Sequence, residues 1–174
     1  QCFSGDYSRL FRVFSEGLAK SWPILLETVE AVGEALATPL AVGGGVRSFE
    51  QVQLLLDRGA DKVVLNTAAL AHPELIDQVS SAYGAQCVVL SIDVRTQSEG
   101  DWQVWSNSGS YDGGCHALAW AREAVDRGAG EVMVTSIQRD GTGEGLDLEL
   151  IGTFANELSV PVIASGGCGL AQHF

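Results

Sequence analysis

The sequence has few basic residues and no long apolar run. Its 174 residues include 10 lysines and arginines against 22 aspartates and glutamates, which gives a formal net charge of −12. Nonspecific nucleic-acid binding depends on clustered Lys and Arg that release counterions. A membrane-spanning helix needs roughly 18 or more consecutive apolar residues, and the chain has no such stretch. We therefore expect neither a nucleic acid nor a membrane as a partner.

Cysteine is sparse and scattered. No Cys-x-x-Cys pair is present among the four cysteines, Cys2, Cys87, Cys115 and Cys168. This spacing supports neither a zinc site nor the disulfide framework of a secreted protein. No secretory signal peptide is recognisable either. These features predict reduced thiols, no bound metal and a cytoplasmic location.

Glycine, in contrast, is abundant and clustered. The 21 glycines make up about 12% of the chain, where about 7% is usual. Hydrophobic residues account for 46% and charged residues for 18%, which is typical of a packed globular domain. At roughly 150 residues per domain, we expect residues 1–174 to form one domain.

Helical and strand patterns alternate from residue 24 onward. Apolar residues at helical spacing, with Ser48 and Gly59 as a start and a stop signal, predict helices at 25–36, 49–58, 73–83, 117–127 and 148–158. Short apolar runs predict strands at 40–42, 62–66, 86–93, 131–137 and 160–165, and a further strand at 10–14 is weakly indicated. A small hairpin is expected around 102–105. This alternation predicts a parallel sheet covered by helices.

An internal repeat indicates the closed form of that sheet. The run from Pro39 to Gly45 is matched, at an offset of 122 residues, by the run from Pro161 to Gly167. Two similar halves of about four βα units make a (βα)8 TIM barrel of about 250 residues. Six strand positions fit this chain. We therefore predict an α/β fold, an incomplete (βα)8 barrel without its first strand and without its last strand and helices.

Both glycine clusters follow a predicted strand, at the end of a barrel where ligands bind. Gly43-Gly44-Gly45 and Ser165-Gly166-Gly167 have no bulky side chains, so their backbone N–H groups can approach an anion. Tight turns alone are the alternative explanation. Neither cluster matches a nucleotide-binding fingerprint. We interpret the pair as sites for a ligand with a phosphate at each end.

The strand at 86–93 ends in a carboxylate. Because side chains alternate along a strand, Val88, Leu90 and Ile92 share an apolar face suited to the outer helices. Asp93 then faces the barrel interior at the carboxyl end of the strand. A part-buried carboxylate there can act as a general acid or base, although a capping or salt-bridged Asp is the alternative.

These segments resemble the cyclase subunit of imidazole glycerol phosphate synthase. The resemblance covers about residues 24–174 and is carried by motifs that include Val42-Gly43-Gly44-Gly45, Asn66-Thr67, Ser91-Ile92-Asp93, Arg139-Asp140-Gly141-Thr142 and Ser165-Gly166-Gly167. It implies a barrel of histidine biosynthesis that takes ammonia from a glutaminase subunit in a heterodimer. Such a barrel converts a bis-phosphorylated ribulosyl aminoimidazole carboxamide nucleotide to imidazole glycerol phosphate and an aminoimidazole carboxamide nucleotide.

The resemblance also implies roles for individual residues. Asp93 is one of two catalytic aspartates, and Lys62 and Glu131 belong to a gate through which ammonia enters. Substrate and phosphate binding falls to Gly44, Gly45, Asn66, Thr67, Asp140, Gly141, Ser165, Gly166 and Gly167. No metal or organic cofactor is implied.

Several positions depart from the family pattern. Residues 1–23 contain no counterpart of the first-strand aspartate, so this chain by itself is expected to be inactive. Gln138 stands where the family usually has Asp, Leu146 where it often has an aromatic residue, and Cys168 where it usually has Ala. Two alternatives remain open: a paralogous barrel that uses ammonia to amidate a sugar of surface polysaccharides, and a non-catalytic scaffold that docks a glutaminase.

Overall fold

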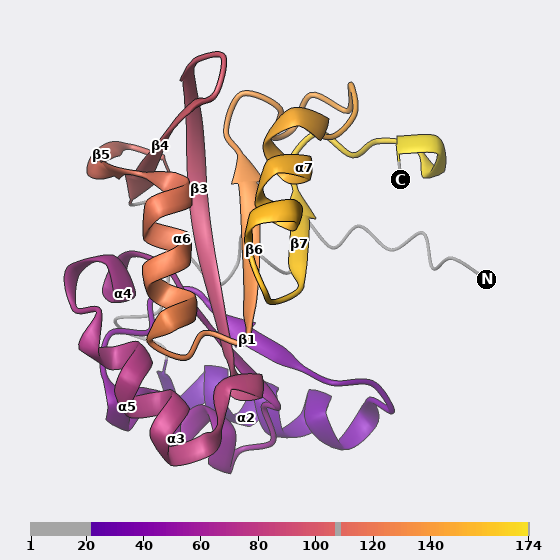
Figure 1. Ribbon diagram of the computed structural model, residues 1–174. Helices are drawn as coiled ribbons and strands as arrows, with labels where there is room; N and C mark the ends of the chain where they lie inside the picture. The colour runs from indigo at the N-terminus through magenta and orange to yellow at the C-terminus, as the bar shows by residue number, and fades with distance from the viewer. Residues whose placement is uncertain (1–21, 107–108, 174) are drawn as a thin grey trace. The chain divides into compact units, whose positions relative to one another are not determined.

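The computed structural model describes residues 22–106 and 109–173 (Figure 1). The chain divides into two compact units, residues 1–64 and 65–174. The strand weakly indicated at 10–14 lies outside the described residues. That the whole chain forms one domain stays a prediction.

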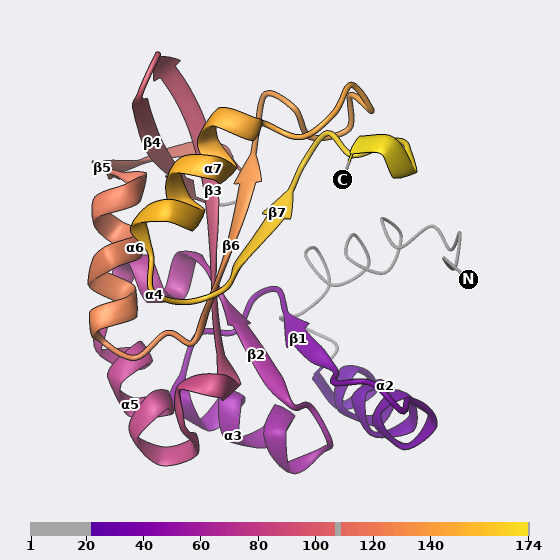
Figure 2. The same ribbon diagram turned by 45° about the vertical axis from the view of Figure 1, so that its right-hand side comes forward.

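The described part of the first unit is a pair of βα segments. It contains α2 (Trp22–Ala35), β1 (Ala41–Gly43), α3 (Phe49–Asp57) and the first residues of β2 (Lys62–Leu65). β1 and β2 pair in parallel, with Val42 opposite Val63 (Figure 2). Ser48 caps α3 by accepting a hydrogen bond from the Gln51 N–H, and Gly59 follows the helix with φ +97°, as the sequence predicts.

The second unit begins with two helices and then forms a mixed sheet. Its elements are α4 (Thr67–Ala71), α5 (Glu74–Tyr83), η1 (Ala85–Cys87), β3 (Val88–Ser98), β4 (Asp101–Ser106), β5 (Tyr111–His116), α6 (Ala117–Asp126), β6 (Glu131–Ser136), α7 (Leu148–Glu157), β7 (Val162–Ser165) and η2 (Ala171–His173). β3, β6 and β7 are parallel neighbours, whereas β4 and β5 extend the sheet from β3 as antiparallel strands.

Helices α6 and α7 cover one face of the parallel strands, as Figure 1 shows. The side chains that point to this face are apolar and almost fully buried: Leu90, Ile92, Val132 and Val134 are each at most 1% exposed. Alternate residues of β6 are only half-buried. The period-two assignment of faces is therefore confirmed, and burial of this apolar face drives the packing.

The alternation of strands and helices and their parallel pairing confirm the predicted α/β architecture of an incomplete (βα)8 barrel. Within the described residues, no helix is long and apolar enough to cross a membrane. Cys87, Cys115 and Cys168 carry free thiols.

The main difference from the sequence prediction is the length of β3. The strand was expected to end at Asp93 but continues to Ser98, because β4 turns back and pairs with it from Asp93 to Ser98. The expected hairpin around 102–105 is thus the second arm of a longer ribbon, and β5 adds a third strand. The short helix α4 was also not predicted. Asp93 consequently lies within β3 rather than at its end.

Removal of the Phe154 side chain should destabilise the second unit strongly. Phe154 on α7 is 0% exposed and packs edge-to-face on Trp102 of β4, with ring centroids 6.3 Å apart. We expect Phe154→Ala to lower the free energy of unfolding by about 3–5 kcal/mol, measured by urea denaturation. Leu148 on the same helix is 74% exposed, so Leu148→Ala should change it by less than about 1 kcal/mol. Equal losses in the two variants would contradict this packing.

Candidate active site

Three polar residues form a row across the parallel strands of the second unit. Asp93 of β3 pairs with Thr135 of β6, and Thr135 pairs with Ser165 of β7. Residues in register on parallel neighbours point to the same face, which here is the face opposite α6 and α7. The row lies near the carboxyl ends of β6 and β7. This is the end at which barrel proteins bind ligands.

Asp93 is the carboxylate of the row, and its pKa is shifted from the ordinary value. Burial raises the pKa of Asp93, and the negative charge of Asp140 raises it further. A hydrogen bond acts in the opposite direction: the Asn66 side-chain amide donates to the Asp93 carboxylate, with Nδ2 and Oδ2 3.2 Å apart. A carboxylate whose pKa is raised toward neutrality exchanges a proton more readily at physiological pH.

Asn66 reaches Asp93 because of its position between β2 and α4. It occupies the residue before the first turn of α4, where an Asn side chain usually accepts a hydrogen bond from the helix backbone. Asn66 makes no such capping bond. Its amide donates to Asp93 instead. Two of the residues assigned by the resemblance, Asn66 and Asp93, are thus brought into direct contact.

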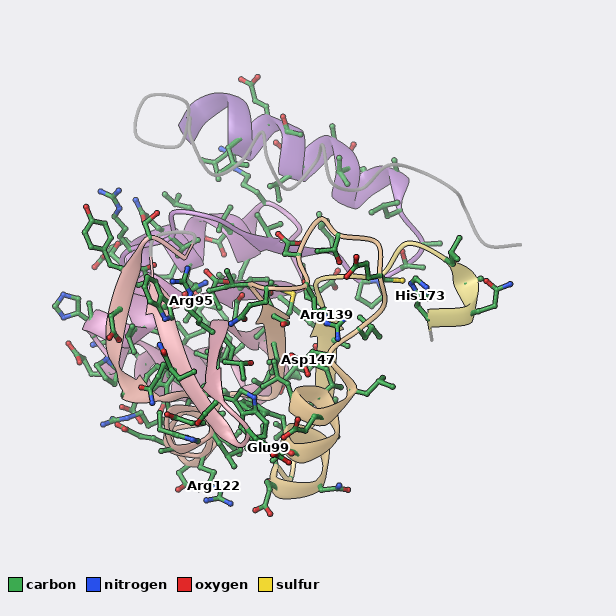
Figure 3. The ribbon with its side chains drawn as sticks, turned by 90° about the horizontal axis from the view of Figure 1, so that it is seen from above. Arg95, Glu99, Arg122, Arg139, Asp147 and His173 are labelled. Carbon is green, nitrogen blue, oxygen red and sulfur yellow. The ribbon has the colours of Figure 1, made fainter. Side chains whose placement is uncertain are left out.

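The loop between β6 and α7 carries Asp140 and is fastened at both ends. At its start, the Gln138 amide forms two hydrogen bonds with the backbone of Thr96 on β3, accepting from N at 3.3 Å and donating to O at 2.9 Å. At its end, Asp147 caps α7 and accepts a hydrogen bond from the buried Ser136 hydroxyl. Figure 3 shows Arg139 and Asp147 on this loop, seen from above.

The glycine turn after β7 is packed against the same loop. Gly166 and Gly167 have φ of +91° and +92°. A Cβ atom on Gly166 would lie 2.7 Å from the carbonyl oxygen of Ser136. A Cβ atom on Gly167 would overlap the carbonyl oxygen of Gly145. The Gly145 N–H also donates to the Gly167 carbonyl at 2.8 Å. These two glycines are therefore required by backbone packing, whether or not they also bind phosphate.

The other glycine turn lies in the first unit. Gly44 and Gly45 follow β1 with φ of +93° and +77°, are exposed, and precede the capped amino terminus of α3. Their backbone resembles that of Gly166 and Gly167, which agrees with the repeat. Phosphate binding at either turn stays a prediction.

The remaining assigned residues are placed but not joined to the Asp93 contact. Lys62 begins β2 and Glu131 begins β6, at the opposite ends of their strands from the expected ligand site. Thr67 begins α4, and Gly141 is exposed on the loop after Asp140. The ammonia gate stays a prediction. Among the described residues, no three His, Cys, Asp or Glu side chains are grouped so that they could hold a metal ion.

Two functional candidates were missed by the sequence prediction, Arg95 and Trp105. Trp105 of β4 lies opposite Asp93 in register, and Arg95 lies two residues beyond Asp93 on β3. Both therefore share the face of the Asp93 row. Alternation continued past Asp93 would have found Arg95, but the strand was predicted to stop there.

Strands and helices in this order, with parallel strand pairing, define an α/β protein of the barrel type, a class that binds ligands at the carboxyl ends of its strands. Residues 14–174 match the protein family described as "Histidine biosynthesis protein", and the chain belongs to this family. The resemblance found in the sequence is confirmed.

Two relatives are similar over most of the chain. Identity is 57% over 159 residues to a Prochlorococcus marinus (strain MIT 9313) protein provisionally named imidazole glycerol phosphate synthase subunit hisF2, covering 91% of this chain and 61% of that protein. It is 43% over 150 residues to the imidazole glycerol phosphate synthase subunit HisF of Gluconacetobacter diazotrophicus, covering 86% and 58%. The chain thus spans about three fifths of the length of these relatives.

Two substitutions should move the pKa of Asp93 in opposite directions. Asn66→Ala removes the donor that lowers this pKa, so the pKa should rise. Asp140→Asn removes a nearby negative charge, so it should fall. Titration of the Asp93 carboxyl carbon by NMR measures both. Asp126→Asn, an exposed site at the end of α6, is the control and should leave the midpoint unchanged. A shift of the same sign in the Asn66 and Asp140 variants would contradict the assigned causes.

An alanine at Gly166 should cost more stability than one at Gly141. Both glycines have positive φ, +91° and +75°, so each substitution should lose about 1–2 kcal/mol from the left-handed backbone alone. Only at Gly166 would the added Cβ also meet the Ser136 carbonyl, because nothing lies within 4 Å of that position at Gly141. Urea denaturation compares the two variants. If both lose the same free energy, the turn after β7 is not held by this close approach.

Proposed function

We propose that this chain contributes Asp93 and the residues around it to the cyclase chemistry of imidazole glycerol phosphate synthase. In this reaction, ammonia and a bis-phosphorylated ribulosyl aminoimidazole carboxamide nucleotide give imidazole glycerol phosphate and an aminoimidazole carboxamide nucleotide. The observation that carries the proposal is the Asn66–Asp93 contact, a perturbed carboxylate on the open face of the parallel strands in a chain of this family.

Asp93 is assigned the proton transfers of the reaction. Its raised pKa results mainly from burial, and the Asn66 amide orients one of its oxygens. The hydroxyl-bearing Thr135 and Ser165 lie in the same row and are suited to hydrogen-bond the sugar or phosphate oxygens of the substrate. Because ring closure needs proton transfer on both sides of the substrate, a second carboxylate on the first strand of the barrel is part of this proposal.

The two glycine turns are assigned to the two phosphates. Gly44 and Gly45 present exposed backbone ahead of α3, where N–H groups without helical partners attract an anion. Asp140 and Gly141, on the loop that packs against Gly166 and Gly167, would border the second phosphate.

The partner in this proposal is a glutaminase subunit that delivers ammonia. Lys62 and Glu131 begin their strands, so in a closed barrel they would lie at the end opposite the substrate. Entry there would keep ammonia out of bulk water, where it is protonated. We assign the protein to the cytoplasm, where phosphorylated metabolites of this kind are made.

A second candidate is the sugar-amidating paralogue, which would use ammonia at the same face. The observation that favours it is Gln138, a neutral amide where the family usually has Asp. The Gln138 amide is hydrogen-bonded to the Thr96 backbone. Because Gln is neutral, the loop that carries Asp140 has one negative charge fewer than it would have with Asp at position 138. Turnover of an activated sugar, with no turnover of the aminoimidazole substrate, would favour this candidate.

Substitution of Asp93 tests the proposal. In the complete protein supplied with ammonia, Asp93→Asn should lower kcat by about 10²- to 10⁴-fold, the usual contribution of a positioned acid or base. KM should change little, because phosphate contacts supply most of the affinity. Asp126→Asn on the surface of α6 is the matched control. An Asp93→Asn variant with normal kcat would exclude Asp93 as the catalytic group.

A further inference from the structure

Arg95 and Trp105 form a stacked pair beside Asp93. The Arg95 guanidinium carbon lies 3.7 Å from the centroid of the Trp105 ring. Trp105 is opposite Asp93 in the antiparallel register of β3 and β4, and Arg95 is on the same face of β3. Figure 3 shows Arg95 in this ribbon. The sheet thus places an aromatic ring opposite the carboxylate that the proposed function uses, with a cation against that ring.

The charge of Arg95 is not neutralised by a carboxylate. Three arginines of the described residues form ion pairs with acidic side chains, namely Arg58 with Glu30, Arg122 with Glu157, and Arg127 with Asp77 and Glu123. Arg95 forms no ion pair within the described residues and makes only the ring contact. Arg47 and Arg139 also form no ion pair within the described residues, but only Arg95 lies against an aromatic ring on the face of Asp93.

Trp105 contributes an unused donor. Its indole Nε1 is buried and has no hydrogen-bond partner in the part of the chain that the structure describes. Buried Trp N–H groups usually find an acceptor, because leaving one unpaired lowers stability. Because this atom is buried, the Trp105 ring itself, rather than its N–H, is the part that can take part in binding.

We propose that the Arg95–Trp105 pair binds the planar heteroaromatic carboxamide of the substrate. This inference rests on the proposed function and assigns the part of the substrate that lies between its two phosphates. The Trp105 ring lies against one side of the guanidinium. The other face can stack on an aromatic ring, and the N–H edge can donate to a carbonyl oxygen.

A phosphate is the less suitable occupant of this pair. The two phosphates of the substrate are already assigned to Gly44–Gly45 and Gly166–Gly167. A guanidinium held against an aromatic ring offers a flat surface as well as its N–H edge, and a flat ligand uses both. Its place beside Asp93 further suits the ring of the substrate, at which protons are exchanged.

Binding of a nucleotide and of a sugar phosphate tests the assignment. The probes are aminoimidazole carboxamide ribonucleotide and ribose 5-phosphate, which lacks the ring, titrated into the complete protein by calorimetry. Arg95→Lys keeps the charge but loses the flat, stacked group. It should weaken binding of the ring-bearing nucleotide about tenfold, in line with a desolvated cation–π contact, and leave ribose 5-phosphate unchanged.

Two further variants sharpen the test. Trp105→Phe keeps an aromatic ring but gives the Arg95 guanidinium a smaller and weaker partner, and it should weaken only the ring-bearing nucleotide. Arg122→Lys, in the α6–α7 ion pair, is the control and should change neither affinity. Urea denaturation of each variant shows whether the fold is kept.

The outcomes separate this inference from the proposed function. If Arg95→Lys weakened the binding of both probes equally, Arg95 would contact the phosphate, and the inference would be overturned. Unchanged affinity for both would overturn it as well, with the proposed function still standing. Failure of the wild-type protein to bind either probe would overturn the proposed function together with the inference.

Discussion

The parallel register of β3, β6 and β7 is the constraint on which the site depends. Burial of Leu90, Ile92, Val132 and Val134 beneath α6 and α7 fixes which residues of these strands face the helices. A shift of one residue would turn every apolar side chain to the other face, so the register is strongly specified. This register aligns Asp93, Thr135 and Ser165 on the face that α6 and α7 do not cover. Burial of the apolar side chains on one face of the strands thus determines where the polar side chains on the other face lie.

The position of Asp93 is unfavourable for stability at neutral pH. Because the folded protein binds the Asp93 proton more tightly than the unfolded chain, stability falls as the pH rises from the ordinary pKa of an Asp to the raised pKa of Asp93. Above that window the full cost remains. The Asn66 hydrogen bond lowers this cost, but burial remains the dominant cause of the shift. A group kept in such an environment at a ligand-binding end of strands is typical of an acid or base that takes part in chemistry.

The sequence was sufficient to predict the alternation of elements, the helix-facing side of β3 and the cap at Ser48, because each depends on residues close together in the chain. It did not predict the extension of β3 through Arg95 and Thr96. Polar residues there resemble a loop, and only pairing with β4 makes them a strand. The Asn66–Asp93 bond, which spans 27 residues, and the Gln138–Thr96 bonds, which span 42, were also beyond a local pattern. The resemblance named Asn66 and Asp93 but could not show that they touch.

The glycines show that a family motif can have more than one cause. Gly166 and Gly167 are required by the approach of Ser136 and Gly145, so their presence alone is weak support for a phosphate site. The same approach, however, joins the turn after β7 to the loop that carries Asp140. Asp140 raises the pKa of Asp93, and the Gln138 bonds tie that loop to β3. An anion bound at Gly166–Gly167 would therefore act on a loop already coupled to Asp93. The close backbone packing thus explains Gly166 and Gly167 without a ligand. The same packing would also connect an anion bound at these glycines to the Asp93 carboxylate.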